Sequence, residues 1–256
     1  EYRQKNKNSS LILDFAYIDG YKSSLENKKN SISHLFANFE ADLSWDNFIN
    51  SNFFLSLKKV SNDTYLKVFD SSIFKSEVIP TNYDVLTSEA KLVLDNENYN
   101  FVAGFQSYEN LSLSSSDRYQ FILPYYNFDK QIFENYENGY FNFSSTGSND
   151  LNNTNNLRTK VINNLNYTSL DLISDSGFKT GYNIFLKNLN TVAKNDTKFK
   201  SSPQMELMSI FELNSSLPLV SQSDKSVDYL SPKVSLRFNP GDMKDYSSDD
   251  RSLNVD

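Results

Sequence analysis

Two acidic residues, Glu40 and Asp42, have the types and the spacing in this sequence that come closest to acid–base chemistry. The residues around them alternate between apolar and polar, so both carboxylates are expected on one face of a β-strand, roughly 7 Å apart. A carboxylate pair at such a distance is suited to glycoside hydrolysis. It is equally suited to the water-facing side of a sheet, and we prefer this second interpretation because charged side chains ordinarily face water.

Histidine and cysteine, the usual nitrogen and sulfur ligands of metals, are almost absent from the chain. His34 is the only histidine, and cysteine is absent, which excludes thiolate metal sites, disulfides and cysteine nucleophiles. We expect His34 at the surface or facing a lumen. The acidic residues Asp242, Asp245, Asp249 and Asp250 lack EF-hand spacing and are expected in a solvated loop. Phosphate-binding loops and serine nucleophile elbows are missing as well, so we expect no enzyme and no cofactor.

The composition restricts the class of protein. The formal net charge of −7 argues against a nucleic-acid partner, which would require clustered Lys and Arg. No run of 18 apolar residues is present, so a membrane-spanning helix is not expected. Mean hydropathy is −0.55, yet aromatic residues make up 14% of the chain, which argues against disorder. A polar average with many Tyr and Phe is typical of a membrane barrel, because only one face of each strand meets lipid.

The elements that must position these residues are β-strands. Alternating segments recur along the chain without helical periodicity, and we predict one continuous antiparallel all-β region of about 12–14 strands over residues 1–256. The expected strands are Leu11–Tyr17, Ser33–Trp45, Phe53–Leu57, Tyr65–Phe69, Leu86–Leu94, Tyr99–Phe105, Tyr119–Tyr125, Ile132–Phe143, Lys160–Asn166, Phe178–Leu189, Gln204–Leu213 and Val227–Phe238. The expected loops are Lys22–Ser31, Ser144–Asn156 and Asn195–Ser202.

The segment Ser33–Trp45 gives the sharpest prediction about the two sheet faces. Its alternation covers about 12 residues, slightly more than the roughly 9–11 residues that cross a bilayer as a tilted strand. We expect one row of side chains to face lipid, namely Leu35, Ala37, Phe39, Leu43 and Trp45. The opposite row is expected to face a hydrated lumen, namely Asn38, Glu40, Asp42 and Ser44.

A short polar run interrupts the next strand. Ser61, Asn62, Asp63 and Thr64 follow Phe53–Leu57 and precede Tyr65–Phe69. Such residues favour turns. We therefore predict a turn or bulge here that positions adjacent strands, and contact with a partner through this loop is the alternative role.

Several stretches together resemble LptD, the family of outer-membrane lipopolysaccharide-assembly proteins, and in particular its alphaproteobacterial members. The resemblance is carried by EYR at Glu1–Arg3, KVSNDTYLKVFD at Lys59–Asp70, LTSEAKL at Leu86–Leu92, RYQFILPYYNF at Arg118–Phe128 and LSPKVSLRFNPGDMKDYSSDDRSLNVD at Leu230–Asp256. It extends over nearly the whole chain and includes the order and approximate spacing of these stretches.

The resemblance implies a location, a function and partners. It implies part of a large transmembrane β-barrel in the outer membrane of a Gram-negative bacterium, which inserts lipopolysaccharide into the outer leaflet. The implied partners are lipopolysaccharide, outer-membrane lipid, an LptE-like lipoprotein that plugs the lumen, and a periplasmic Lpt bridge. The family meets this bridge through an N-terminal jellyroll domain. Neither the jellyroll nor the closing C-terminal strands are expected within residues 1–256.

Two other classes stay open. Another outer-membrane barrel, such as a porin, would share the alternation of apolar and polar residues. A soluble β-sandwich that binds carbohydrate would instead bury one sheet face against a second sheet, and its strands should be shorter than Ser33–Trp45.

Overall fold

The computed structural model describes residues 1–22, 29–69, 77–113, 117–135, 139–153, 155–223 and 226–241. Within them the chain is almost entirely β-structure, and 13 strands form one antiparallel sheet. The prediction of an antiparallel all-β region with about 12–14 strands is confirmed at this level. The expected loop Lys22–Ser31 is too long, because β2 includes Lys22 and β3 begins at Lys29. The residues between them and the acidic residues from Asp242 onward lie outside the described residues.

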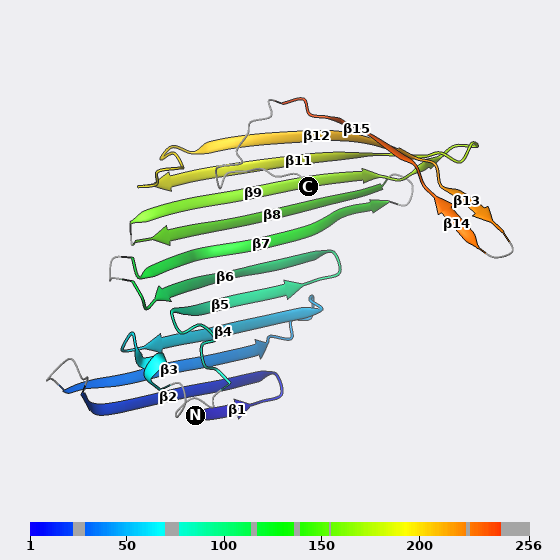
Figure 1. Ribbon diagram of the computed structural model, residues 1–256. Helices are drawn as coiled ribbons and strands as arrows, with labels where there is room; N and C mark the ends of the chain where they lie inside the picture. The colour runs from blue at the N-terminus through cyan, green and yellow to red at the C-terminus, as the bar shows by residue number, and fades with distance from the viewer. Residues whose placement is uncertain are drawn as a thin grey trace.

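The sheet is a meander in which nearly every strand pairs with its neighbours in sequence (Figure 1). The strands are β1 (Tyr2–Lys5), β2 (Ser9–Lys22), β3 (Lys29–Asp42), β4 (Asn50–Val60), β5 (Val85–Asp95), β6 (Tyr99–Asn110), β7 (Tyr119–Asn135), β8 (Gly139–Asn152), β9 (Asn156–Ser169), β10 (Leu172–Ile173), β11 (Lys179–Lys194), β12 (Gln204–Ser216), β13 (Leu219–Gln222), β14 (Val227–Leu230) and β15 (Lys233–Phe238).

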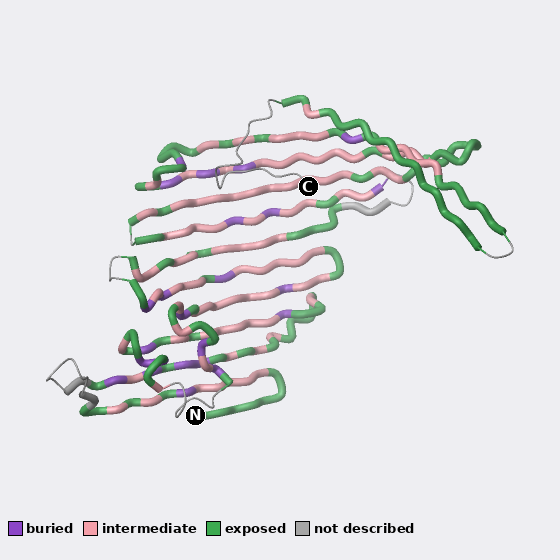
Figure 2. Tube along the Cα trace, viewed as in Figure 1, coloured by how far each residue is buried: buried purple, intermediate pink, exposed green. Residues whose placement is uncertain are grey.

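Four short strands depart from this simple order. Strand β10 pairs with β11, and β15 returns to pair with β12. Between them β13 and β14 form a separate hairpin, which projects from the corner of the sheet (Figure 1). All three strands from β13 to β15 are exposed along their length (Figure 2).

A short helix, α1 (Tyr65–Phe69), lies in the connection between β4 and β5. The predicted strand at these residues is wrong. Tyr65 and Leu66 are both buried although they are adjacent, which a strand with one hydrated face does not allow. The rings of Tyr65 and Phe69, one helical turn apart, lie 5.0 Å from each other between centroids. The five residues Y-L-K-V-F are too few to distinguish the helical period of 3.6 residues from the strand period of two.

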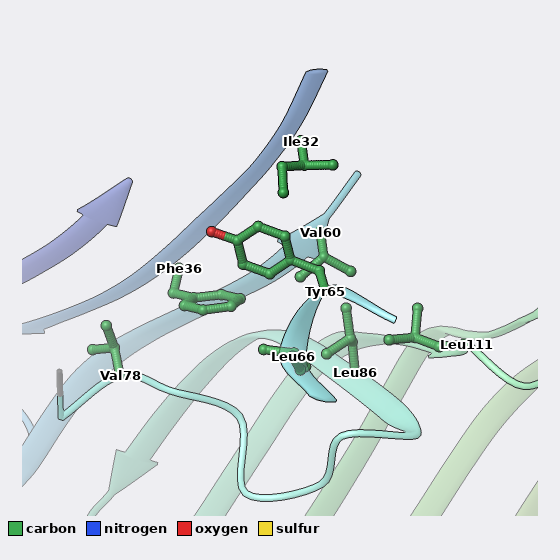
Figure 3. Packing of buried hydrophobic residues seen from close by; sticks show 8 residues of the cluster. All are labelled: Ile32, Phe36, Val60, Tyr65, Leu66, Val78, Leu86 and Leu111. Carbon is green, nitrogen blue, oxygen red and sulfur yellow. The ribbon is translucent and has the colours of Figure 1, made fainter. Parts of the chain in front are cut away.

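Helix α1 packs on one face of the sheet and makes the principal apolar core of the described residues. The core consists of Ile32, Phe36, Val60, Tyr65, Leu66, Val78, Leu86 and Leu111. In Figure 3 the two helix side chains lie among residues of β3, β4 and β5. Elsewhere most strand residues are only partly buried (Figure 2), because a single sheet without a second layer leaves both faces accessible.

The expected loop Ser144–Asn156 is also wrong. Residues up to Asn152 belong to β8, and β9 begins at Asn156. The expected strand Ile132–Phe143 is not one strand either, because β7 ends at Asn135 and β8 begins at Gly139. Small polar side chains are tolerated in β8 because they hydrogen-bond to one another across the strands: Ser145 Oγ donates to Asn163 Oδ1 at 2.7 Å. By contrast, the expected loop Asn195–Ser202 is confirmed between β11 and β12.

At two glycines, a tyrosine ring of β7 occupies the space that a larger side chain would need. A Cβ atom on Gly104 of β6 would lie 2.8 Å from the hydroxyl of Tyr125, and one on Gly147 of β8 would lie 2.3 Å from the ring of Tyr126. Because Tyr125 and Tyr126 are adjacent in a strand, they cover glycines on opposite sheet faces and opposite neighbouring strands.

Candidate functional surfaces

The two faces of the sheet differ in chemistry, and each is named here by its β3 residues. The apolar face carries Leu35, Ala37 and Phe39, and the polar face carries Asn38 and Glu40. Cross-strand register extends both faces over the sheet, because paired residues point to the same side: Phe39 is paired with Leu11 and Leu55, and Glu40 with Ser10 and Phe54.

Large hydrophobic side chains on the apolar face are exposed. Phe15 is 60% exposed, Phe105 is 52% exposed and Met205 is 74% exposed. Further exposed members of this face are Tyr17, Leu35, Leu57, Leu207, Phe211, Leu213, Val234, Leu236 and Phe238. An uncovered apolar surface that extends over a whole sheet marks contact with another apolar medium or partner.

Aromatic rings line one end of the apolar face, the turn end, where the β3–β4 and β5–β6 turns lie. Rings of Trp45, Phe48, Tyr99 and Phe128 follow one another with centroids 5.9–6.1 Å apart. A second series at the same end joins Tyr167, Tyr182 and Phe211 with centroids 5.6 and 6.0 Å apart.

A charged cluster lies at the opposite end of the apolar face, the helix end, near α1. Glu109 is buried, and its carboxylate forms ion pairs with Lys59 Nζ at 2.8 Å and with Arg118 Nη2 at 2.6 Å. Arg118 also contacts Asp63 at 2.6 Å, which fixes the Ser61–Thr64 turn beside β7. The Lys59 ammonium lies 5.3 Å from the centroid of the Tyr119 ring. Paired charges therefore end the apolar surface on this side.

The polar face is connected by side-chain hydrogen bonds. Glu89 Oε1 accepts hydrogen bonds from Gln106 Nε2 at 2.7 Å and from Tyr125 OH at 2.6 Å. Asn38 Oδ1 accepts from Ser56 Oγ at 2.9 Å and from Lys58 Nζ at 3.1 Å. These networks satisfy polar groups on a face that remains accessible to water.

His34 lies on the same face of β3 as Asn38 and Glu40, but it is buried there rather than exposed at the surface, which was one of the two predicted positions. Its side chain is 1% exposed, its Nδ1 lies 2.8 Å from the hydroxyl of Tyr65, and its Nε2 lies 3.3 Å from Asp14 Oδ1. The ring stacks on Phe36 with centroids 4.5 Å apart. Burial and the nearby Asp14 carboxylate raise the pKa of Tyr65, so its hydroxyl stays protonated at neutral pH. This arrangement fastens α1 to the sheet and has no access to a substrate.

The structure places the predicted β3 residues in two groups. Those up to Asp42 lie in the strand, with Asn38, Glu40 and Asp42 on the polar face and Leu35, Ala37 and Phe39 on the apolar face. Leu43, Ser44 and Trp45 follow the strand end, and Ser44 has a φ of 50°. Strand alternation does not extend to these three residues. Trp45 is 47% exposed and contacts Phe48.

The Ser61–Thr64 run forms a turn that leads into α1. Asn62 Oδ1 accepts hydrogen bonds from the backbone N of Thr64 at 2.9 Å and from its hydroxyl at 2.8 Å. The backbone N of Val68 donates to the carbonyl of Thr64 at 3.0 Å, which closes the first helical turn. The turn thus starts a helix that folds back over the sheet.

Sequence reasoning missed a polar ladder that crosses the apolar face at mid-strand. Tyr126 OH lies 3.0 Å from Ser145 Oγ, Ser145 donates to Asn163, and Asn163 Nδ2 donates to Asn188 Oδ1 at 3.1 Å. The ladder links β7, β8, β9 and β11. Ser145 lies in the segment that was predicted as a loop, whereas Asn163 and Asn188 lie in the predicted strands Lys160–Asn166 and Phe178–Leu189.

Neither a metal site nor a spanning helix is found in the described residues. No group of three or more His, Asp or Glu side chains there is arranged to hold a metal ion. No helix in the same ranges is long and apolar enough to cross a membrane. The sequence matches no protein-family model and no curated protein.

Proposed function

We propose that this chain forms part of the wall of an outer-membrane β-barrel, with the apolar face toward lipid and the polar face toward a hydrated lumen. The observation that carries the proposal is the exposed apolar face, on which Phe15, Phe105 and Met205 are each more than half exposed. In water such a surface is unfavourable by roughly 25 cal/mol per Å² of apolar area. Lipid removes this cost without a second protein layer.

The height of the apolar face supports the same proposal. On β6 it extends from Tyr99 at the turn end to Glu109 at the helix end. These ten residue steps span about 33 Å along an extended strand. A strand tilt of about 40° reduces this length to about 25 Å, the height of the apolar band in outer-membrane barrels. The aromatic rings at the turn end then lie where aromatic girdles meet the membrane interface.

Within this wall, the resemblance to LptD suggests the cargo. A hydrated polar face offers a route for the sugar part of lipopolysaccharide, while its acyl chains partition toward the membrane. The role is transport rather than catalysis. An LptE-like lipoprotein in the lumen and a periplasmic Lpt bridge are the proposed partners, and the outer membrane of a Gram-negative bacterium is the proposed location.

The soluble carbohydrate-binding β-sandwich is the less favoured alternative. A sandwich requires a second sheet over the apolar face, and within the described residues the second sheet is the two-stranded β13–β14 hairpin, which is itself exposed. Strands of 11–17 residues, such as β4 and β7, also exceed those of most soluble proteins. A porin is the other barrel protein that fits the structure. A porin would conduct ions or small solutes, whereas the proposed function requires lipopolysaccharide as cargo.

Labelling of single cysteines tests which face meets lipid, and the absence of native cysteine makes it direct. Phe39→Cys and Leu55→Cys, on the apolar face, should react with a maleimide dissolved in the bilayer. Asn38→Cys and Ser56→Cys, their neighbours on the polar face, should react with a charged maleimide in water. Reaction of all four with the charged reagent would remove the membrane proposal.

Co-purification tests the cargo. The protein extracted from outer membranes in detergent should carry lipopolysaccharide and a small lipoprotein. A membrane-embedded protein that carries neither, and that conducts ions as an open pore, would support the porin alternative instead.

A further inference from the structure

A hollow of 390 Å³ opens over strands β5–β9 at the turn end of the sheet. Its volume lies within the roughly 300–1,000 Å³ of small-ligand sites. The lining includes Asn100, Asp129, Asn142 and Ser144, whose cross-strand register places them on the polar face. Tyr99, Lys130 and Phe143 also line it from the apolar side, so the hollow lies at the end of the sheet, where the two faces meet. It is separate from the buried His34 contact and from the charged cluster, which both lie at the helix end.

Amide side chains give the hollow its binding chemistry. Asn142 and Asn166 are cross-strand partners in β8 and β9, and within the part of the chain that the structure describes their side chains form no hydrogen bond. Each amide presents two N–H donors and one carbonyl acceptor. Hydroxyl groups both donate and accept hydrogen bonds, so two adjacent amides match a pair of neighbouring hydroxyls.

The charge of the hollow narrows the class of ligand. Asp95, Glu97 and Asp129 contribute three formal negative charges to the lining, and Lys130 contributes one positive charge. A phosphorylated ligand meets net repulsion there, which is strong at contact distance and weakens with added salt. A metal ion is not the expected occupant, because no three such groups in the described ranges are arranged to hold one.

We propose that this hollow binds an unphosphorylated, uncharged sugar unit through Asn142 and Asn166. The inference rests on the proposed function for its setting, since Asn142 and Asn166 on the polar face would contact the sugar part of a passing glycolipid at this end of the wall. It adds a selection against phosphorylated sugars at this end of the wall. Binding itself requires only the folded sheet.

Trp45 provides the measurement because it is the only tryptophan in the chain. Its ring contacts Phe48, which contacts Tyr99 in the lining, and Asn96 of the hollow donates to the backbone carbonyl of Asn47 in the same turn. The full chain in detergent micelles is titrated with the neutral trisaccharides maltotriose, cellotriose and chitotriose, and separately with glucose 6-phosphate. We expect a saturable fluorescence change with at least one trisaccharide and at least tenfold weaker binding of the sugar phosphate.

Three variants make the result specific. Asn142→Phe fills the hollow and should abolish binding, whereas Asn38→Phe, also on the polar face but in β3, should leave it unchanged. Asp129→Asn removes one negative charge and should narrow the discrimination against the sugar phosphate severalfold. Far-UV circular dichroism checks that each variant is folded.

The inference is overturned if no trisaccharide binds, if Asn142→Phe still binds, or if the sugar phosphate binds as tightly as the neutral sugars. Failure of the inference and failure of the proposed function give different results. If the cysteines on the two faces are labelled as expected but no sugar binds, the sugar-binding inference is wrong and the proposed function stands. If sugar binds but Phe39→Cys does not react with the maleimide in the bilayer, the proposed membrane function is wrong and the sugar-binding inference stands.

Discussion

His34 Nδ1 and the Tyr65 hydroxyl lie 2.8 Å apart in a buried contact that ties strand β3 to helix α1. The helix is only five residues long, too short to be stable by itself in water. Its position therefore depends on such tertiary contacts, and their removal should release the β4–β5 connection from the sheet.

Tyr65→Phe tests this contact with minimal change in shape. Loss of the hydroxyl deprives buried His34 of a hydrogen-bond partner, and we expect the free energy of unfolding to fall by about 1–3 kcal/mol. Urea unfolding followed by circular dichroism measures it. Tyr2→Phe is the matched control, because Tyr2 is 54% exposed in β1 and should change stability by less than about 0.5 kcal/mol. Equal effects of both changes would contradict the role given to His34.

Two substitutions within α1 separate packing from helix propensity. Leu66 is fully buried, and Leu66→Ala should lower the free energy of unfolding by about 2–5 kcal/mol because it leaves a cavity. Val68 is 50% exposed on the same helix, and Val68→Ala should be close to neutral. If Val68→Ala is as damaging as Leu66→Ala, the helix does not pack as described.

Phe39→Lys tests the apolar face energetically. Phe39 is paired with Leu55, the central residue of β4, and so lies near mid-height of the wall. A lysine facing lipid at that depth costs about 2–4 kcal/mol. Unfolding in lipid vesicles should show this loss for Phe39→Lys and almost none for Glu40→Lys, because Glu40 is exposed on the polar face of the same strand. The reverse order would exchange the two faces.

Gly147→Ala tests the close approach of Tyr126. The added Cβ would lie 2.3 Å from the ring, so the ring must move, and we expect a loss of about 1–3 kcal/mol in unfolding free energy. Gly241→Ala is the control, because the nearest atom to its added Cβ is 3.5 Å away. A stable Gly147→Ala variant would mean that Tyr126 does not cover this glycine.

Asp196 gives a pH prediction in the β11–β12 loop, outside the strands. Burial raises its pKa, but hydrogen bonds from the backbone N–H groups of Phe199 and Lys198 and from Arg158 outweigh burial, so the pKa falls below the usual 3.8. A carboxyl with a lowered pKa stabilises the fold above the unfolded-state pKa and loses this effect as pH falls through the folded-state pKa. The stability difference between wild type and Asp196→Asn should therefore be constant above about pH 5 and shrink below pH 3.8. A difference that is unchanged at pH 3 would exclude the carboxylate as its cause.

The sequence was sufficient to predict long strands wherever one residue in two was strongly apolar. In β3 the row Leu35, Ala37 and Phe39 is an unambiguous period of two, and the hairpin at Asp95 was visible from its turn residues. In β8 the alternation is hidden because Ser145 and Gly147 replace apolar residues on the apolar face. Ser145 and Gly147 fit a strand here because Asn163 hydrogen-bonds to Ser145 and the Tyr126 ring covers Gly147. Both partners lie in neighbouring strands, so the sequence of β8 alone does not reveal them.

The functional surfaces were only partly predictable for the same reason. The assignment of Asn38 and Phe39 to opposite faces follows from local alternation alone. The charged cluster of Lys59, Glu109 and Arg118, by contrast, joins residues up to 59 positions apart, so its existence depends on the order and register of four strands. Helix α1 was missed because five residues contain too little of either period.

The nearly unbroken meander has a consequence for how the protein is made. From β1 to β9 each strand pairs with the one that precedes it in the chain, so every pairing closes a short loop, apart from the β4–β5 connection. Short loops are fast to close, which favours growth of the sheet by pairing of strands that are neighbours in the chain. The connection that carries α1 is then the slowest step to close, and early packing of Tyr65 and Leu66 against β3 would hold β4 in place until β5 arrives.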